Sequence, residues 1–397
     1  MYARPFRFTM TEDLDHILFQ LGEDHKQWSN AVAPPIAQTS NFCFPDVASF
    51  RRAFEMEQQE PLYTRGVNPT VSLLRKKIAA LEGAEDALVW SSGAAAITAA
   101  VMSVVKQGDH VICVQHPYSW AKYLLNDYLP KFGISCSFVD GTSVENFAGA
   151  IRENTRLIYL ESPTSFTFEL QDLKGVAALA KEKNISTICD NSYAGPLAQS
   201  PLQFGIDMVI HSATKYINGH SDVVAGVICA NKERIHQLLK SEYMTLGSIC
   251  SPFDAWLILR GLRTLKLRFQ HSTRNAQILA DHLYAHPKIK SVHYPFHPSF
   301  PQFDLAKKQM QMGNGLLTIR LKASSIAEVE KCCNALKYFK MAVSWGGHES
   351  LQIPVCTFYK NEKDQHHLPW DMVRLYCGLE EPETLWNDLQ TALAELN

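Results

Sequence analysis

The sequence predicts an α/β protein in which a large, mostly parallel, doubly wound sheet is followed by a smaller domain. Between about residues 61 and 250, short apolar runs alternate with helical patterns, as in successive βα units. The runs are almost entirely apolar, which is typical of buried parallel strands. A chain of 397 residues is also too long for one small core. The expected strands are Ala87–Trp90, Val111–Val114, Leu157–Glu161, Ser186–Asp190, Met208–His211 and Val224–Cys229.

The segments on either side of this sheet domain have different patterns. Residues 1–60 lack sustained periodicity and contain Pro34-Pro35, so we expect an extended arm that contacts a partner subunit. The sheet domain spans 61–251, and 252–397 hold a linking helix and a C-terminal α+β domain. The linking helix begins at Pro252 and continues through Trp256, Leu259, Leu262 and Leu265. A final helix carries Leu385, Leu389, Leu393 and Leu396 on one face.

Composition narrows the classes of partner and compartment. The net charge of −2 and the pI near 6.7 give no field that favours nucleic acid or an anionic membrane. No apolar stretch is long enough to span a bilayer, and Met1–Met10 lack the apolar core of a secretory signal. The ten cysteines contain no CxxC pair and lie mostly in apolar strands, which indicates reduced thiols. We therefore expect a cytoplasmic enzyme with a small-molecule substrate.

A lysine and a carboxylate stand at the ends of two expected strands. Lys215 closes Ser212-Ala213-Thr214-Lys215, and Asp190 ends the preceding strand. Pyridoxal phosphate needs an amine for a Schiff base, an anion beside its pyridine nitrogen, and donors for its phosphate. Sites in such sheets lie at the carboxyl ends of the strands, where these residues fall. The alternative is a solvated surface lysine and a strand-end cap.

A small-residue turn follows the first expected strand and supplies a candidate phosphate site. Ser91-Ser92-Gly93-Ala94-Ala95-Ala96-Ile97 opens a helix, whose first N–H groups and dipole favour an anion. An ordinary capped helix would carry the same residues. Next to Lys215, the turn is interpreted as a phosphate cup.

Together these segments resemble the pyridoxal-phosphate enzymes of cysteine and methionine metabolism, the cystathionine lyase and synthase family, over nearly the whole chain. That resemblance implies a fold-type-I PLP-dependent transferase fold. The matching segments are Pro34-Pro35-Ile36, Tyr63-Thr64-Arg65-Gly66-Val67-Asn68-Pro69-Thr70, Ser91-Ser92-Gly93, Glu161-Ser162-Pro163-Thr164, Asp190-Asn191-Ser192-Tyr193, Ser212-Ala213-Thr214-Lys215-Tyr216, Gly219-His220-Ser221-Asp222, Gly261-Leu262-Arg263-Thr264-Leu265 and Ser344-Trp345-Gly346-Gly347-His348-Glu349-Ser350.

The resemblance implies a role for each site residue. Lys215 would hold the cofactor covalently and then move the substrate α-proton, while Asp190 would pair with the pyridine N–H. Tyr118 would stack on the cofactor ring and, like Lys215, is a candidate proton donor to the leaving sulfur. The residues implied around the phosphate are Ser92, Gly93, Ala94, Ser212 and Thr214.

Four residues are implied at the substrate and at the subunit boundary. Tyr63 and Arg65 match a pair that reaches the neighbouring subunit's cofactor, with Tyr63 also near the substrate. Ser344 and Arg374 match the clamp on the substrate α-carboxylate, for which a guanidinium is well shaped. The resemblance implies a homodimer with shared active sites, and two such dimers are expected to form a homotetramer. It implies no metal. Alone, Arg374 between Val373 and Leu375 would be an edge-strand residue.

Departures from the family pattern favour one reaction. Ser165 stands where many γ-acting members have asparagine, Val343 where they have glutamate, and Trp120 where methionine γ-lyases have cysteine. The segment Ser344-Trp345-Gly346-Gly347 resembles cystathionine β-lyase. We therefore expect β-elimination of cystathionine to homocysteine, pyruvate and ammonia. The alternatives are a γ-synthase or γ-lyase on the same scaffold, an aminotransferase, and a non-catalytic binding protein, which would be expected to lack Lys215 or Asp190.

Overall fold

A seven-stranded sheet forms the centre of the larger part of the molecule in the computed structural model, which describes residues 13–396. In spatial order its strands are β1 (Asp86–Trp90), β7 (Gly226–Ala230), β6 (Met208–Ser212), β5 (Ser186–Asp190), β4 (Thr155–Glu161), β2 (His110–Val114) and β3 (Ser135–Val139). Strands β6, β5, β4, β2 and β3 are parallel. Strand β7 runs antiparallel to both of its neighbours.

The predicted strands are all present, with small shifts at their ends. Strands β2 and β7 are buried along their whole length, in keeping with sequences that are apolar except for His110 of β2. The prediction missed β3, an edge strand whose Ser135 and Ser137 alternate with Cys136 and Phe138. Every residue of β3 is only half-buried, because a strand at the edge of the sheet has a neighbouring strand on one side only.

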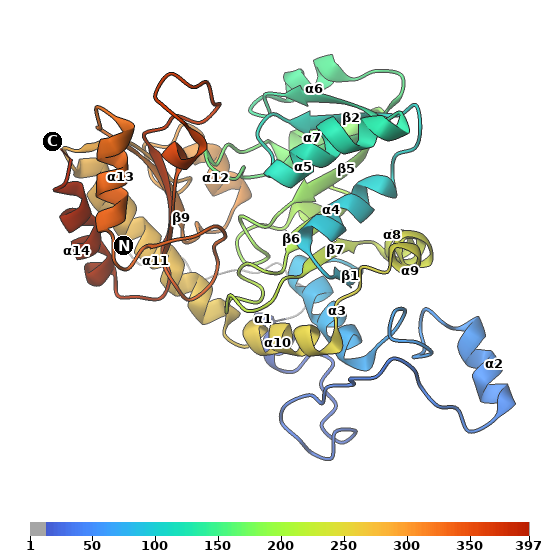
Figure 1. Cartoon of the computed structure of the whole chain (residues 1–397). Coiled ribbons are helices and arrows are strands. Elements are labelled where there is room, and N and C mark those ends of the chain that lie inside the picture. The colour runs from blue at the N-terminus through green and yellow to red at the C-terminus, as the bar shows by residue number, and fades with distance from the viewer. Residues whose placement is uncertain (1–12, 397) are drawn as a thin grey trace.

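Helices cover this sheet in the βα order that the sequence predicts (Figure 1). Helix α4 packs against β6 and β7, and α3 packs against β1. Asn68 caps the start of α3, Pro69 occupies its first turn, and Gly83 ends it in the left-handed conformation. The helices of this part are α3 (Pro69–Glu82), α4 (Gly93–Met102), α5 (Ser119–Tyr123), α6 (Val144–Ala150), α7 (Leu173–Glu182), α8 (Lys232–Leu238) and α9 (Met244–Leu246).

A second, five-stranded sheet forms the C-terminal part. Its order is β10 (Lys340–Met341), β11 (Leu351–Pro354), β12 (Met372–Tyr376), β9 (Leu316–Leu321) and β8 (Ile289–His293). The accompanying helices are α12 (Phe303–Gln309), α13 (Ile326–Ala335) and α14 (Pro382–Leu393). Leu385 and Leu389 of α14 pack in one core with Leu317 and Leu375 of the sheet. Leu396 is buried in the same core, although α14 ends before it.

The linking helix is two helices, so the prediction of one continuous helix through Leu265 is wrong. Helix α10 (Pro252–Leu262) ends at Arg263, and α11 (Leu265–Ala285) starts after Thr264, whose backbone is not helical. Arg268 stabilises the break, because its guanidinium donates to the Gly261 carbonyl at 2.8 Å and to Thr264 Oγ1 at 3.0 Å. The bond to the Gly261 carbonyl occupies an acceptor that a continuous helix would offer to the N–H four residues further on.

The N-terminal arm divides into a docked helix and a projecting one. Helix α1 (Leu14–Phe19) buries Leu14, Ile17 and Leu18 near α3. Helix α2 (Val47–Glu55) stands away from the body (Figure 1) and leaves Phe50 and Phe54 exposed. Contact of residues 1–60 with a partner stays a prediction, as do the domain boundaries. The predicted lack of a secretory signal concerns Met1–Met10, which lie outside the described residues. No helix within 13–396 is long and apolar enough to cross a membrane.

Candidate active site

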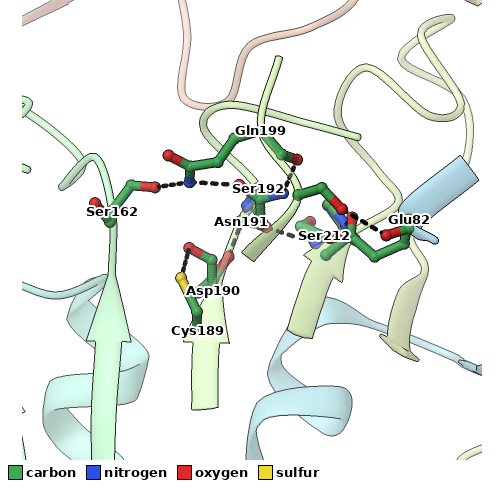
Figure 2. Close-up of polar contacts among 10 residues, drawn as sticks. Glu82, Ser162, Cys189, Asp190, Asn191, Ser192, Gln199 and Ser212 are labelled. Carbon is green, nitrogen blue, oxygen red and sulfur yellow. Dashed lines mark hydrogen bonds and ion pairs between the residues drawn. The ribbon is translucent and has the colours of Figure 1, made fainter. Parts of the chain in front are cut away.

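The carboxyl ends of β4, β5 and β6 are joined by hydrogen bonds into one edge (Figure 2). The Ser192 N–H donates to Asp190 Oδ1 at 2.9 Å, and the Ser212 N–H donates to Ser192 Oγ at 2.6 Å. Gln199 Nε2 reaches across to the Ser162 carbonyl at 2.7 Å. The loops that follow three strands therefore hold one another in place, which fixes the side chains at this edge.

Asp190 is buried at the end of β5, with 6% of its surface exposed. Burial raises the pKa of its carboxyl, while the hydrogen bonds from Ser192 and the charges of His211 and Lys215 act in the opposite direction. Asp190 ends β5 and Lys215 follows the neighbouring strand β6, as the sequence predicts. The carboxylate thus has several groups that favour its charged form inside the protein.

Lys215 directs its amine toward the C-terminal domain. Its Nζ donates to Ser344 Oγ at 2.8 Å and lies 4.6 Å from the centre of the Trp345 ring. Burial, followed by the charge of Arg374, lowers the pKa of Lys215 to about 8, and Asp190 opposes this shift. An amine with that pKa is partly neutral at pH 7, which is what a nucleophile or base requires. Ser344 itself has a φ of 86°, an unusual conformation for serine.

The first turn of α4 meets the ends of β6 and β7 closely enough to form a cup. A Cβ on Gly93 would lie 3.1 Å from Ser212 Oγ, so a larger residue would crowd that hydroxyl. Ser92 caps the helix by accepting from the Ala95 N–H at 3.0 Å. Within residues 13–396, neither Gly93 nor Ala94 donates its N–H to a protein acceptor. These two donors are free for an anion.

Thr214 closes the strand side of the cup. Its Oγ1 donates to the Ala225 carbonyl at 3.2 Å and accepts from the Ala225 N–H at 3.1 Å. These bonds tie the segment before Lys215 to the start of β7 and fix its path. The predicted phosphate contact of Thr214 stays a prediction.

Arg374 is buried on β12 and held on several sides. Its Nη1 donates to both the carbonyl and Oγ of Ser165 at 3.2 Å, and its Nη2 lies 3.5 Å from the Ser344 carbonyl. The guanidinium lies 4.6 Å from the Phe166 ring centre and 5.0 Å from that of Trp345. Burial lowers the pKa of Arg374 to about 10, so it stays charged at neutral pH.

A cavity of about 730 Å³ lies beside Lys215, between the domain of the seven-stranded sheet and that of the five-stranded sheet. Of the predicted site residues, it is lined by Lys215, Tyr118, Ser344 and Arg374. The predicted phosphate residues and Asp190 belong to the adjoining strand edge rather than to the cavity wall. Tyr63 and Arg65 do not line it. They lie together, with the Arg65 guanidinium 5.7 Å from the Tyr63 ring centre, and Tyr63 is largely exposed.

Sequence reasoning gave no role to several residues that the structure brings to the site. Glu161 accepts from the Tyr118 backbone N–H at 2.6 Å, and Phe166 and Trp345 flank Arg374. His211 Nε2 lies 2.6 Å from Glu82 Oε2 in a fully buried pair, and the charge of His211 acts to lower the pKa of Asp190. For Glu161 a signal existed, because it ends the strand before that of Asp190. The contact of His211 with a residue 129 positions away had none.

The residues present fit pyridoxal phosphate. They offer a partly neutral amine at Lys215, a buried carboxylate at Asp190, two free helix N–H groups beside Ser212, and the Tyr118 ring on the cavity wall. No group of three or more metal-ligating side chains is found within residues 13–396. The amine, the carboxylate and the free helix N–H groups are the donors that an organic phosphate cofactor of this kind requires.

Comparison with known proteins agrees with this donor set. Residues 15–394 match the sequence model of the Cys/Met metabolism PLP-dependent enzymes. The chain belongs to that family. It is 36% identical over 378 residues to L-methionine γ-lyase of Pseudomonas putida, covering 94% of this chain and 95% of the relative. It is 35% identical to human cystathionine γ-lyase, covering 94% of this chain and 91% of the relative.

The fold of this family member also matches a solved structure, that of metB from Corynebacterium glutamicum. The TM-score is 0.90 at 32% identity, over 98% of this chain and 99% of the other. The chain thus has the fold-type-I architecture that its motifs implied, and pyridoxal phosphate is its cofactor.

Proposed function

We propose that this protein is a pyridoxal-phosphate-dependent carbon–sulfur lyase that eliminates a thiol from a sulfur amino acid. The observation that carries the proposal is the Lys215 amine, which lies on the cavity wall 2.8 Å from Ser344 Oγ and has a pKa of about 8. Pyridoxal phosphate, when bound, withdraws electrons from the substrate Cα and so acidifies its proton. The base that takes this proton is Lys215 Nζ.

Arg374 orients the amino acid in this proposal. Its guanidinium is fixed by Ser165 and by two aromatic rings, so a substrate carboxylate meets a donor that loses little freedom on binding. Trp345 lies beside both Arg374 and Lys215. A carboxylate held by Arg374 therefore places the neighbouring Cα near the Lys215 amine.

The comparisons favour cleavage at Cγ over the cleavage at Cβ that the motifs suggested. The relatives reported above are named methionine and cystathionine γ-lyases. Cleavage at Cγ requires Lys215 to move a proton at Cβ as well as at Cα. Cystathionine β-elimination remains the second candidate, because Ser165 replaces the asparagine of γ-acting members and here binds Arg374. Val343, at the cavity wall, is 79% exposed and offers no charge to a distal amino group.

Product analysis of the purified holoenzyme tests the proposal. With cystathionine, cleavage at Cγ gives 2-oxobutyrate, cysteine and ammonia, whereas cleavage at Cβ gives pyruvate, homocysteine and ammonia. With methionine, cleavage at Cγ gives 2-oxobutyrate, methanethiol and ammonia. An aminotransferase would instead convert the cofactor to its amine form when amino acid is added without a keto acid. Release of neither keto acid from either substrate would contradict a carbon–sulfur lyase.

We also propose that the working unit is a homodimer, itself paired into a tetramer, with shared sites. Tyr63 and Arg65 lie together at the surface and off the cavity of their own chain, as expected of residues that complete a neighbour's site. The exposed aromatic residues of α2 offer apolar area for such a contact.

A further inference from the structure

Glu161 lies between two predicted cofactor contacts at the edge of the large sheet. Strand β4, which it ends, is flanked by β5 with Asp190 and by β2, which leads into the loop of Tyr118. Glu161 and Asp190 face each other in the register of β4 and β5. On the other side, Glu161 Oε2 accepts from the Tyr118 N–H at 2.6 Å. One side chain thus connects the carboxylate strand to the stacking loop.

Helix α5 provides no hydrogen-bond acceptor for the Tyr118 N–H. Tyr118 is the residue before α5, and its side chain caps nothing there. The first N–H groups of a helix have no intrahelical acceptor, and a cap or a neighbouring side chain must supply one. Glu161 supplies it from a residue 43 positions away. Loss of the acceptor would free the backbone that carries the Tyr118 ring.

The carboxyl groups of Asp190 and Glu161 differ in how many neighbouring groups stabilise the ionised form. Asp190 has the Ser192 N–H together with His211 and Lys215, whereas Glu161 has the Tyr118 N–H and the more distant Arg374. Burial first, and the charge of Asp190 second, raise the pKa of Glu161 well above its usual range. Two buried carboxylates side by side do not both ionise readily.

We propose that Glu161 is a positioning residue that acts as a neutral clamp: it fixes the Tyr118 ring over the cofactor through the backbone N–H and leaves Asp190 as the charged carboxylate. The inference rests on the proposed role of Tyr118 as the ring that faces the cofactor. It assigns Glu161 no contact with substrate. What the site needs from Glu161 is an acceptor oxygen at the right place, and not a charge.

Two substitutions separate the acceptor from the charge. Glu161→Gln keeps an oxygen that can accept from Tyr118 and cannot ionise, while Glu161→Ala removes the acceptor. In the alanine variant we expect the cofactor dissociation constant to rise and kcat/KM to fall by roughly 5- to 150-fold, the range for a lost buried hydrogen bond. In the glutamine variant both should stay within about threefold of the wild type, because its amide oxygen retains the neutral acceptor.

Hydrogen exchange gives a readout that does not depend on turnover. The Tyr118 amide should exchange slowly in the wild type and in Glu161→Gln, and faster in Glu161→Ala, measured in the holoenzyme and without cofactor. The visible circular dichroism of the bound cofactor should change only in the alanine variant. A glutamine variant that loses activity and cofactor affinity would overturn the neutral clamp, even if the alanine variant does not fold.

A double-mutant cycle tests whether Glu161 acts through the ring. In the Tyr118→Ala background, Glu161→Ala should cost less than threefold further, because there is no ring left to position. An undiminished further loss would show that Glu161 acts by another route and would overturn the proposal. If Tyr118→Ala alone leaves cofactor affinity and kcat/KM unchanged, then the proposed role of Tyr118 fails first, and the clamp has no function to serve.

Discussion

The low pKa of Lys215 gives a prediction that can be measured on the protein before the cofactor is attached. Attachment requires the neutral amine, so its rate should follow the neutral fraction of Lys215 as pH rises. A pKa of about 8 in place of the ordinary 10.5 makes that fraction at pH 7 roughly 300 times larger than for a surface lysine. The rate should therefore rise up to about pH 8 and then level off.

The neighbours of Lys215 predict the direction in which two variants move this midpoint. Arg374 lowers the pKa of Lys215 and Asp190 raises it, while burial has the largest effect. Arg374→Gln should therefore shift the midpoint to higher pH, and Asp190→Asn should shift it to lower pH. Arg374→Lys, which keeps the positive charge, is the matched control and should shift it less than the glutamine variant does.

The assay is the appearance of the visible absorption band after pyridoxal phosphate is mixed with cofactor-free protein, followed from pH 6 to 11. The midpoint, and not the amplitude, is compared, because Asp190→Asn is also expected to weaken cofactor binding. Lys215→Ala serves as the blank and should form no band. A wild-type midpoint near the ordinary lysine value, or shifts of the two variants in the same direction, would refute the reasoning from burial and charge.

Three further predictions test the cup, a buried histidine and the shared site. A Cβ on Gly226 would lie 2.2 Å from the Ser92 carbonyl, so Gly226→Ala should displace the cup and weaken cofactor binding by roughly tenfold in a fluorescence titration; unchanged binding would contradict the close packing. Burial, followed by the charge of Arg152, lowers the pKa of His110 to about 4. Below pH 6.5 the histidine therefore binds a proton in the unfolded chain but not in the native protein. The free energy of unfolding should fall as pH drops from 6.5 to 4. Urea unfolding at pH 7.5 and 5 should show a smaller difference for His110→Gln than for the wild type. Mixing Arg65→Ala with Lys215→Ala subunits should restore one working site per mixed dimer although each parent is nearly inactive, and no recovery after verified subunit exchange would argue against sharing.

Much of the fold could be predicted because its signals are local. Each central strand contains a short, mostly apolar run that ends at a turn, so the βα order can be followed along the chain. The carboxyl edge of a parallel sheet gathers whatever follows its strands, which is why Lys215 and Asp190 could be placed near each other. The missed strand β3 and the helix break at Thr264 lacked such signals, because polar and apolar residues alternate along this edge strand and the break depends on Arg268.

The chemistry of the site divides in the same way. The motifs determined the family and the cofactor, since residue types at fixed spacing supply an amine, an anion and phosphate donors. The motif comparison also favoured cleavage at Cβ, whereas the relatives favour Cγ. The difference between these reactions lies in the distances from Lys215 Nζ to the substrate carbons. The identities of Ser165 and Val343 alone do not define those distances.

By itself, the sequence determined most of the strands of the large sheet and which chemical groups they carry to its edge, because propensity, apolar pattern and turn residues act within a few positions. Only the tertiary structure decided which groups meet. Ser165 and Arg374 are 209 positions apart, Lys215 and Ser344 are 129 apart, and Glu161 and Tyr118 are 43 apart. These contacts form where loops of separate strands and of two domains converge, and burial there sets the charge state of each group.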